Sequence, residues 1–228
     1  MLLWMGIALA ASPTPDRPSV SRSGSLVADD TLELELGAMW GAVRTVPTTL
    51  KYSIDGVVEP RLSANLDGIA NGSPMMQAGA KIRLMEKRGD ALALWAGSTV
   101  PVHGGEPWLG EIHMLFSTDL AGDLGFGLNA GLDFAGDGGG VTFAGVPLIG
   151  LVSLTPGSRF SVFAELAGRA GVPGCRDLGC LYSQITLDGG VYLSITEILT
   201  LDGGVGWSLP TQQPYGTLGL TANLGRLE

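Results

Sequence analysis

The stretch DLGFGLNAGLDF, residues 123–134, alternates strictly between apolar residues and residues that are polar or glycine. Its apolar positions are Leu124, Phe126, Leu128, Ala130, Leu132 and Phe134. A period of two is typical of a β-strand with one apolar face and one polar face. About twelve residues at roughly 3.3 Å each, tilted by about 40°, span roughly 30 Å, the thickness of the hydrocarbon layer of a bilayer.

The same alternation recurs along most of the chain and predicts about twelve strands. The expected strands are residues 31–41, 45–54, 57–66, 75–84, 91–100, 111–120, 123–134, 141–154, 159–169, 183–195, 199–209 and 215–225. The connections after the even-numbered strands are short, and most of the others are longer. Outer-membrane barrels have tight periplasmic turns, longer outer loops and an even number of strands. We therefore expect an all-β fold, a single closed antiparallel transmembrane β-barrel joined as an up-and-down meander.

Alternation alone does not distinguish a soluble barrel from a membrane barrel, but the composition does. Charged residues make up 15% of the chain, against about 25% in soluble domains, and there are 36 glycines. The polar faces carry mostly Gly, Ser, Asn, Thr and Asp, whereas a soluble exterior is rich in Lys and Glu. After the N-terminus no run of about eighteen apolar residues occurs, which excludes helical membrane spans. The apolar faces are therefore expected to point toward lipid.

Aromatic residues near the expected strand ends agree with a membrane-spanning barrel. Such barrels carry aromatic girdles at the two membrane–water interfaces. The candidates for the outer rim are Trp40, Phe134, Phe143, Trp207 and Tyr215, and Phe160 is the candidate for the inner rim.

The N-terminus predicts export to the bacterial outer membrane. Residues 1–11, MLLWMGIALAA, have the apolar core and small-residue cleavage site of a signal peptide, although the first basic residue is Arg17. Residues 12–30 are rich in Pro and Ser, and we expect a short periplasmic segment too short to form a large plug. The barrel then occupies residues 31–228.

Charged and amide side chains on the polar strand faces are the candidates for the barrel lining. They either line a conduit and tune its selectivity or pair across the interior as a polar plug. These lumen-lining candidates are Glu33, Glu35, Arg61, Asn65, Lys81, Arg83, Glu111, His113, Asn129, Asp133, Glu165, Arg169, Asp188 and Asp202.

The sequence offers few residues for catalysis or for binding a metal or cofactor. His113 with Ser117 and Asp119 resembles a hydrolase trio, but a lumen-lining histidine is the preferred interpretation, and we expect no enzyme, metal or cofactor. Cys175 and Cys180 form a small loop disulfide or remain free thiols. The net charge of −9 argues against a nucleic-acid partner.

Part of the chain resembles a bacterial outer-membrane family. The resemblance rests on DRPSVS at residues 16–21, LELELGA at 32–38 and TTLKYSIDGVVEPRLSANL at 48–66. In these stretches the chain is similar to the transporter family named for the MetA pathway of phenol degradation. The resemblance implies an outer-membrane β-barrel that passes small hydrophobic or aromatic compounds, and it implies no catalytic motif.

The sequence therefore predicts a passive outer-membrane channel or transporter for small molecules, with outer-membrane lipid and a small-molecule permeant as its partners. The first alternative is a structural or surface-interaction barrel with a blocked lumen. A second, weaker alternative is an outer-membrane lipid hydrolase.

Overall fold

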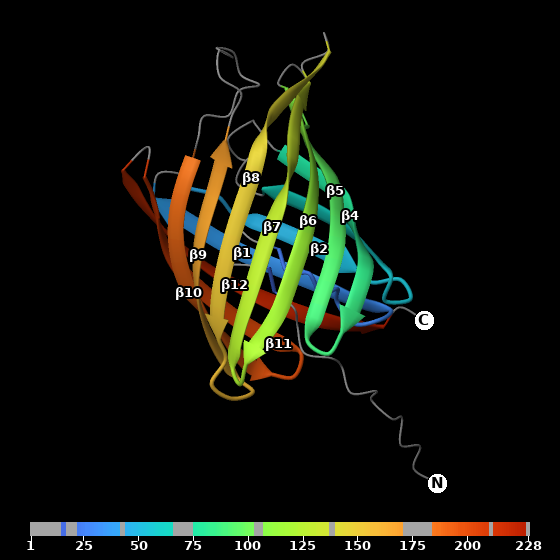
Figure 1. Cartoon of the computed structure of the whole chain (residues 1–228), viewed down its shortest axis with the longest axis vertical. Helices are drawn as coiled ribbons and strands as arrows, with labels where there is room; N and C mark the ends of the chain where they lie inside the picture. The colour runs from blue at the N-terminus through green and yellow to red at the C-terminus, as the bar shows by residue number, and fades with distance from the viewer. Residues whose placement is uncertain are drawn as a thin grey trace.

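The computed structural model describes residues 15–16, 22–41, 44–65, 75–102, 107–136, 140–170, 184–209 and 212–226. These residues form twelve strands (Figure 1). The strands are β1 (Thr31–Gly41), β2 (Pro47–Tyr52), β3 (Val58–Asn65), β4 (Met75–Lys87), β5 (Asp90–Pro101), β6 (Trp108–Ala121), β7 (Leu124–Gly136), β8 (Val141–Leu154), β9 (Phe160–Ala170), β10 (Gln184–Thr196), β11 (Leu199–Ser208) and β12 (Gln213–Arg226). Among the described residues, no helix is long and apolar enough to cross a membrane.

The strands pair in sequence order and close into a barrel. Each strand is antiparallel to its neighbours, and β1 closes the ring against β12, with Leu36 opposite Leu220. A closed ring leaves no unpaired sheet edge, which is the condition for a sheet to span a bilayer. The predicted fold, a twelve-stranded antiparallel meander, is confirmed.

The short connections all lie at one end of the barrel; in Figure 1 those after β4, β6, β8 and β10 are at the bottom and the one after β2 is at the right. They join β2 to β3, β4 to β5, β6 to β7, β8 to β9 and β10 to β11. In the Asp55–Gly56 turn between β2 and β3 both residues have positive φ angles, 50° and 59°, as the tight turn of a twisted hairpin requires. We name this the short-turn end and the opposite end the long-loop end. The predicted alternation of connection lengths holds in part: the connections after β3, β5 and β9 are longer than every short-turn connection, whereas those after β7 and β11 are not.

Strands β4 and β6 extend three residues beyond an expected bound, and the extensions of other strands are of one or two residues. Strand β4 runs to Lys87, and the register against β5 shifts between Arg83 and Met85. A bulge inserts one extra residue and breaks the alternation, which explains why the consecutive residues Leu84 and Met85 are both exposed. Strand β6 begins at Trp108, three residues earlier than the predicted start at Glu111.

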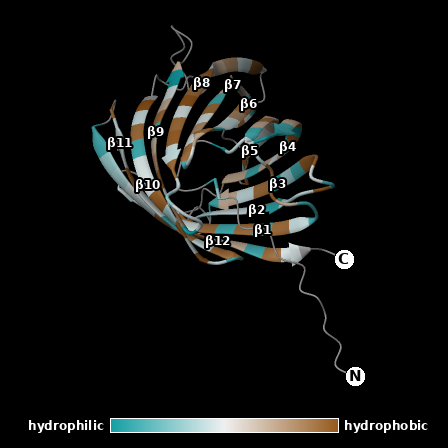
Figure 2. Cartoon of the chain, turned by 60° about the horizontal axis from the view of Figure 1, so that its bottom comes forward, coloured by the Kyte–Doolittle hydropathy of each residue, from teal (hydrophilic) through white to brown (hydrophobic). Residues whose placement is uncertain are grey.

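The barrel has an inverted distribution of polar and apolar side chains. Large apolar residues lie outside, such as Leu166 with 56% of its surface exposed and Val205 with 71%. Charged residues lie inside, and Glu33 and Lys51 are at most 1% exposed. Figure 2 shows the resulting alternation of hydrophobic and hydrophilic residues along each strand. This inversion is typical of a barrel whose outer face meets lipid.

The outer aromatic residues follow the predicted girdle with two differences. Trp40, Phe143 and Trp207 are exposed near the long-loop end, Phe134 packs edge-on against Phe143 at 6.3 Å, and Phe160 is exposed near the short-turn end.

Tyr215 does not belong to this girdle, because its hydroxyl donates a hydrogen bond to the buried Asp188 inside the barrel. Trp108, which was not among the predicted girdle residues, covers Gly110 and Gly136 on the outer face with its indole.

Candidate functional site

The described residues 15–16 and 22–30, here called the N-terminal segment, lie inside the barrel and not in a periplasmic tail. The Asp16 amide donates to Glu35 Oε1 at 2.9 Å, and the Val27 amide donates to Glu59 Oε2 at 2.6 Å. Lys81 Nζ donates to the Ser25 carbonyl at 2.8 Å. The expected periplasmic placement of residues 12–30 is therefore wrong for this part. Through these contacts the segment lies against the wall formed by β1 to β4.

The wall beneath the segment is a buried charge cluster on β1 to β4. Lys51 Nζ lies 2.9 Å from Glu33 Oε1 and 2.5 Å from Glu35 Oε1, and Lys81 Nζ lies 3.8 Å from Glu59 Oε1. The pairs follow from strand register, because Glu33 is directly opposite Lys51 and Glu59 is directly opposite Lys81. Buried charges are tolerated only when they are paired and hydrogen-bonded, and here neighbouring strands supply the partners.

Asp16 is the first anchor of the N-terminal segment. Its carboxylate is bonded to the Arg61 guanidinium and lies 3.6 Å from Lys51 Nζ, and it also accepts the Ser23 amide at 2.9 Å. Burial alone would raise the pKa of the Asp16 carboxyl, but Arg61, Lys51 and Lys81 outweigh it and hold the pKa well below its usual range. Asp16 is therefore held as an anion against buried cations.

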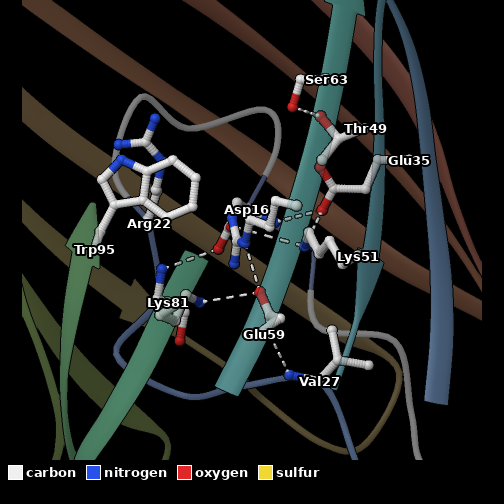
Figure 3. Close-up of polar contacts among 12 residues, drawn as sticks. Asp16, Arg22, Val27, Glu35, Thr49, Lys51, Glu59, Ser63, Lys81 and Trp95 are labelled. Atoms are coloured by element: carbon white, nitrogen blue, oxygen red, sulfur yellow. Dashed lines mark hydrogen bonds and ion pairs between the residues drawn. The ribbon is translucent and has the colours of Figure 1, made fainter. Parts of the chain in front are cut away.

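Arg22 is the second anchor, and the pocket that holds it is here called the Arg22 site. Its guanidinium carbon lies 4.5 Å from the centroid of the Trp95 ring, and one of its nitrogens donates to Glu111 Oε1 at 2.8 Å. Trp95 Nε1 and Gln77 Nε2 donate to the same oxygen, each at 2.7 Å. In Figure 3, Arg22 lies over the Trp95 ring.

Glycines on the strands make room for the Trp95 ring. A Cβ at either Gly79 or Gly97 would lie 2.5 Å from a ring carbon, closer than real Cβ atoms approach. Leu26 of the N-terminal segment packs with Trp95, Ala93 and Leu115 in a small apolar cluster. The segment is thus held by two charged anchors and one apolar anchor.

Glu111, His113 and Asp133 form a network next to the Arg22 site. His113 Nε2 lies 2.8 Å from Asp133 Oδ1, and Arg169 binds Asp133 Oδ2 at 2.6 Å. In the described part of the chain these are the three residues whose donor atoms lie close enough, within 4.8 Å, to hold a metal ion. Arg22 and Arg169 already neutralise the two carboxylates, so the arrangement fits an ion-pair network better than a metal site.

The wall across the lumen is acidic. Glu165 on β9 lies directly opposite Asp188 on β10, Asp202 follows on β11, and all three are buried. The Tyr215 hydroxyl donates to Asp188 Oδ2 at 2.9 Å. Asn129 on β7 is also buried.

Two cavities flank the contact between the N-terminal segment and the wall. The inner cavity, of about 460 Å³, lies toward the short-turn end and is lined by Arg22, Asp16 and residues of β5 to β11 such as Asp119, Ser161 and Tyr192. The outer cavity, of about 320 Å³, lies toward the long-loop end and is lined mainly by β1 to β5.

The two cavities approach each other at Glu111. Gln77 lines the outer cavity and Arg22 lines the inner cavity, and both donate to the same oxygen of Glu111. This contact lies between the two spaces.

The structure places the predicted lining residues in three settings. Nearly fully buried are Glu33, Glu35, Arg61, Lys81, His113, Asn129, Asp133, Glu165, Asp188 and Asp202. Partly exposed are Asn65, Glu111 and Arg169. Arg83 lies near the short-turn end, where its Nε pairs with Glu86 at 3.0 Å.

Five residues that fix the segment to the wall were not among the predicted site residues: Asp16, Arg22, Lys51, Glu59 and Trp95. Lys51 and Glu59 sit at polar positions of the strand alternation and could have been found there. Asp16 and Arg22 precede the first strand and carry no periodic signal. The candidate disulfide residues Cys175 and Cys180, and the candidate signal peptide at residues 1–11, lie outside the described residues.

Comparisons with known proteins agree on the fold. No known protein family and no curated protein matches the sequence, so the resemblance to the MetA-pathway family gains no support.

Among solved structures, the KdgM porin in complex with disordered oligogalacturonate aligns with a TM-score of 0.68 at 10% identity, covering 85% of this chain and 99% of that one. The NanC porin aligns at 0.64 and 12% identity, covering 85% of this chain and all of that one. The outer-membrane protein Omp33 of Acinetobacter baumannii aligns at 0.58 and 12% identity, covering 85% and 98%. The chain is thus a closed twelve-stranded barrel with the fold of outer-membrane porins.

Proposed function

We propose that the protein is a passive outer-membrane channel for small molecules whose lumen is narrowed by its own N-terminal segment. The observation that carries this proposal is the pair of cavities, about 460 and 320 Å³, on either side of the contact between Arg22 and Glu111. The exposed apolar outer face supports a location in outer-membrane lipid. Twelve strands lie between the filled eight-stranded barrels and the open sixteen-stranded porins, which fits a narrow passage.

The charges of the lumen favour cations and neutral molecules. Asp16, Glu86, Asp90 and Asp119 line the inner cavity, and Arg22 is the basic residue among its lining side chains. The acidic wall of Glu165, Asp188 and Asp202 adds to this bias, because field lines are focused in a narrow passage. The KdgM porin structure contains oligogalacturonate, a chain of carboxylate sugars. We propose that the permeant of the present barrel does not carry such a negative charge.

Aromatic rings also contribute to the inner cavity. Phe163 and Tyr192 line it with their ring centroids 5.4 Å apart. These rings offer a surface that an apolar or aromatic part of a permeant would contact. We therefore include small aromatic compounds, which the family resemblance implies, among the proposed permeants.

The proposal is tested by ion conductance of the refolded protein in a planar bilayer. We expect discrete current steps, and a reversal potential under a salt gradient that shows cation preference. A reversal potential that shows anion preference would contradict the assigned charge bias. The variant Arg159→Ala, which removes an exposed arginine at the short-turn end, serves as a matched control and should conduct like the wild type.

The second candidate function is a structural or surface-interaction barrel with a blocked lumen. The many buried contacts of the N-terminal segment favour this candidate. A folded wild-type barrel that carries no current at any voltage would support it. We propose no enzymatic role, because the His113 ring nitrogens face Asp133 and Arg22 rather than a nucleophile.

A further inference from the structure

The Arg22 site has the two elements that recognise a guanidinium group. The Trp95 ring offers a π face, and Glu111 Oε1 offers a charged acceptor 2.8 Å from an Arg22 nitrogen. A guanidinium is planar, stacks on aromatic rings and donates hydrogen bonds in its own plane, so it uses both elements at once. His113 Nδ1, 3.5 Å from the other terminal nitrogen of Arg22, borders the same group.

The groups that would contact a guanidinium all come from the strands, although Leu26 of the N-terminal segment also packs with Trp95. Gly79 and Gly97 leave the space for the Trp95 ring, and Gln77 Nε2 and Trp95 Nε1 fix the Glu111 carboxylate. Every one of these residues belongs to β4, β5 or β6. The pocket should therefore keep its shape when Arg22 leaves it.

The site also lies between the two cavities. Arg22 borders the inner cavity, whose lining is rich in carboxylates and hydroxyls, and Glu111 is bonded to Gln77 of the outer cavity. A small cation that collects in the acidic inner cavity therefore reaches the group that occupies the site.

We propose that the Arg22 site is a binding site for small organic cations that carry a guanidinium group, and that these cations compete with Arg22 for it. Arg22 is then a tethered occupant that stands in for the ligand. Its displacement removes the contact between the two cavities and widens the passage. The widening of the passage rests on the proposed channel function, but binding of the cation at the site does not require conduction.

Binding of methylguanidinium to the refolded full chain in detergent, measured by isothermal titration calorimetry, tests the competition. We expect Arg22→Ala to bind the probe at least about tenfold more tightly than the wild type, because a site occupied nine-tenths of the time by a tethered group weakens binding tenfold. Arg22→Lys should lie between the two, since lysine keeps the charge but lacks the planar stacking group. Sodium chloride at equal ionic strength should give no heat of binding.

A double variant locates the site. Arg22→Ala with Glu111→Gln should lose binding, and Arg159→Ala should behave as the wild type. Equal affinity in the wild type and Arg22→Ala, or full binding in the double variant, would overturn the proposal. Heat-modifiable migration in detergent gels confirms that each variant has folded, and Arg22→Lys replaces Arg22→Ala in the test if the latter does not fold.

A bilayer measurement separates this proposal from the channel function. Methylguanidinium should raise the conductance of the wild type more than that of Arg22→Ala. Binding that depends on Glu111, without current in either protein, would support the site and overturn the channel. Current in both proteins without binding to Arg22→Ala would overturn the site and leave the channel.

Discussion

Replacing Asp16 by Asn should release the N-terminal segment from the wall without unfolding the barrel. The substitution keeps the shape of the side chain but removes its charge from Arg61 and Lys51. Hydrogen bonds to charged groups contribute about 1.5–3 kcal/mol each, so losing one such bond favours the released state by roughly 10- to 150-fold. The strands keep their own ion pairs, such as Lys51 with Glu33 at 2.9 Å.

Limited trypsin digestion measures this release. The Arg22–Ser23 bond lies in the N-terminal segment, and its cleavage rate follows the released fraction when release is fast compared with cleavage. We expect Asp16→Asn to accelerate this cleavage by roughly 10- to 150-fold. Cleavage at the exposed Lys87–Arg88 turn provides an internal reference that should not change.

The matched control is Asp55→Asn, which makes the same chemical change at an exposed turn. Asparagine tolerates the positive φ of 50° at this position, so no effect is expected. Equal cleavage of the Arg22–Ser23 bond in Asp16→Asn and Asp55→Asn would refute the assignment of Asp16 as an anchor.

Three further predictions address the apolar anchor, the pH dependence and the lipid-facing surface. Leu26→Ala should accelerate the same cleavage by at least about tenfold, since removing a buried leucine costs about 2–5 kcal/mol, and an unchanged rate would exclude Leu26 as an anchor. Because the pKa of Asp16 is lowered, its contribution to docking is complete above the ordinary carboxyl pKa of about 3.9 and is lost as pH falls toward the docked-state value. Hydrogen exchange of the segment should therefore stay slow down to about pH 4 and rise below it, and Asp16→Asn should show no such step. Leu166→Lys on the outer face should lower the free energy of unfolding in lipid vesicles by about 2–4 kcal/mol, whereas Ser161→Lys in the inner cavity should cost much less.

The strands could be predicted from the sequence because each strand's alternation of apolar and polar residues depends only on neighbouring residues in the chain. A period of two separates a lipid-facing side from a lumen side, and the pattern LELEL already places Glu33 and Glu35 together on one face. The turn chemistry of Asp55–Gly56 then fixes where a strand pair reverses. Deviations occur where the pattern is broken locally, as at the bulge after Arg83.

The occupant of the lumen could not be predicted from the same pattern. Asp16 and Arg22 lie in a Pro- and Ser-rich stretch without periodicity, and only the folded barrel brings Arg61 and Glu111 to them. Tyr215 was misplaced for a related reason. A tyrosine near a strand end fits a lipid interface, but its position in the alternation of β12 puts its hydroxyl on Asp188. These pairs form only when the sheet closes into a barrel, and the alternation of residues along a single strand does not show which side chains the closed barrel brings together.

The most direct test of the account compares single-channel conductance of the wild type with that of a chain lacking residues 12–30. The account predicts that removing the segment joins the two cavities and raises the conductance severalfold while the cation preference remains. An unchanged conductance, or a folded but silent barrel in both cases, would contradict the claim that the N-terminal segment narrows a water-filled passage.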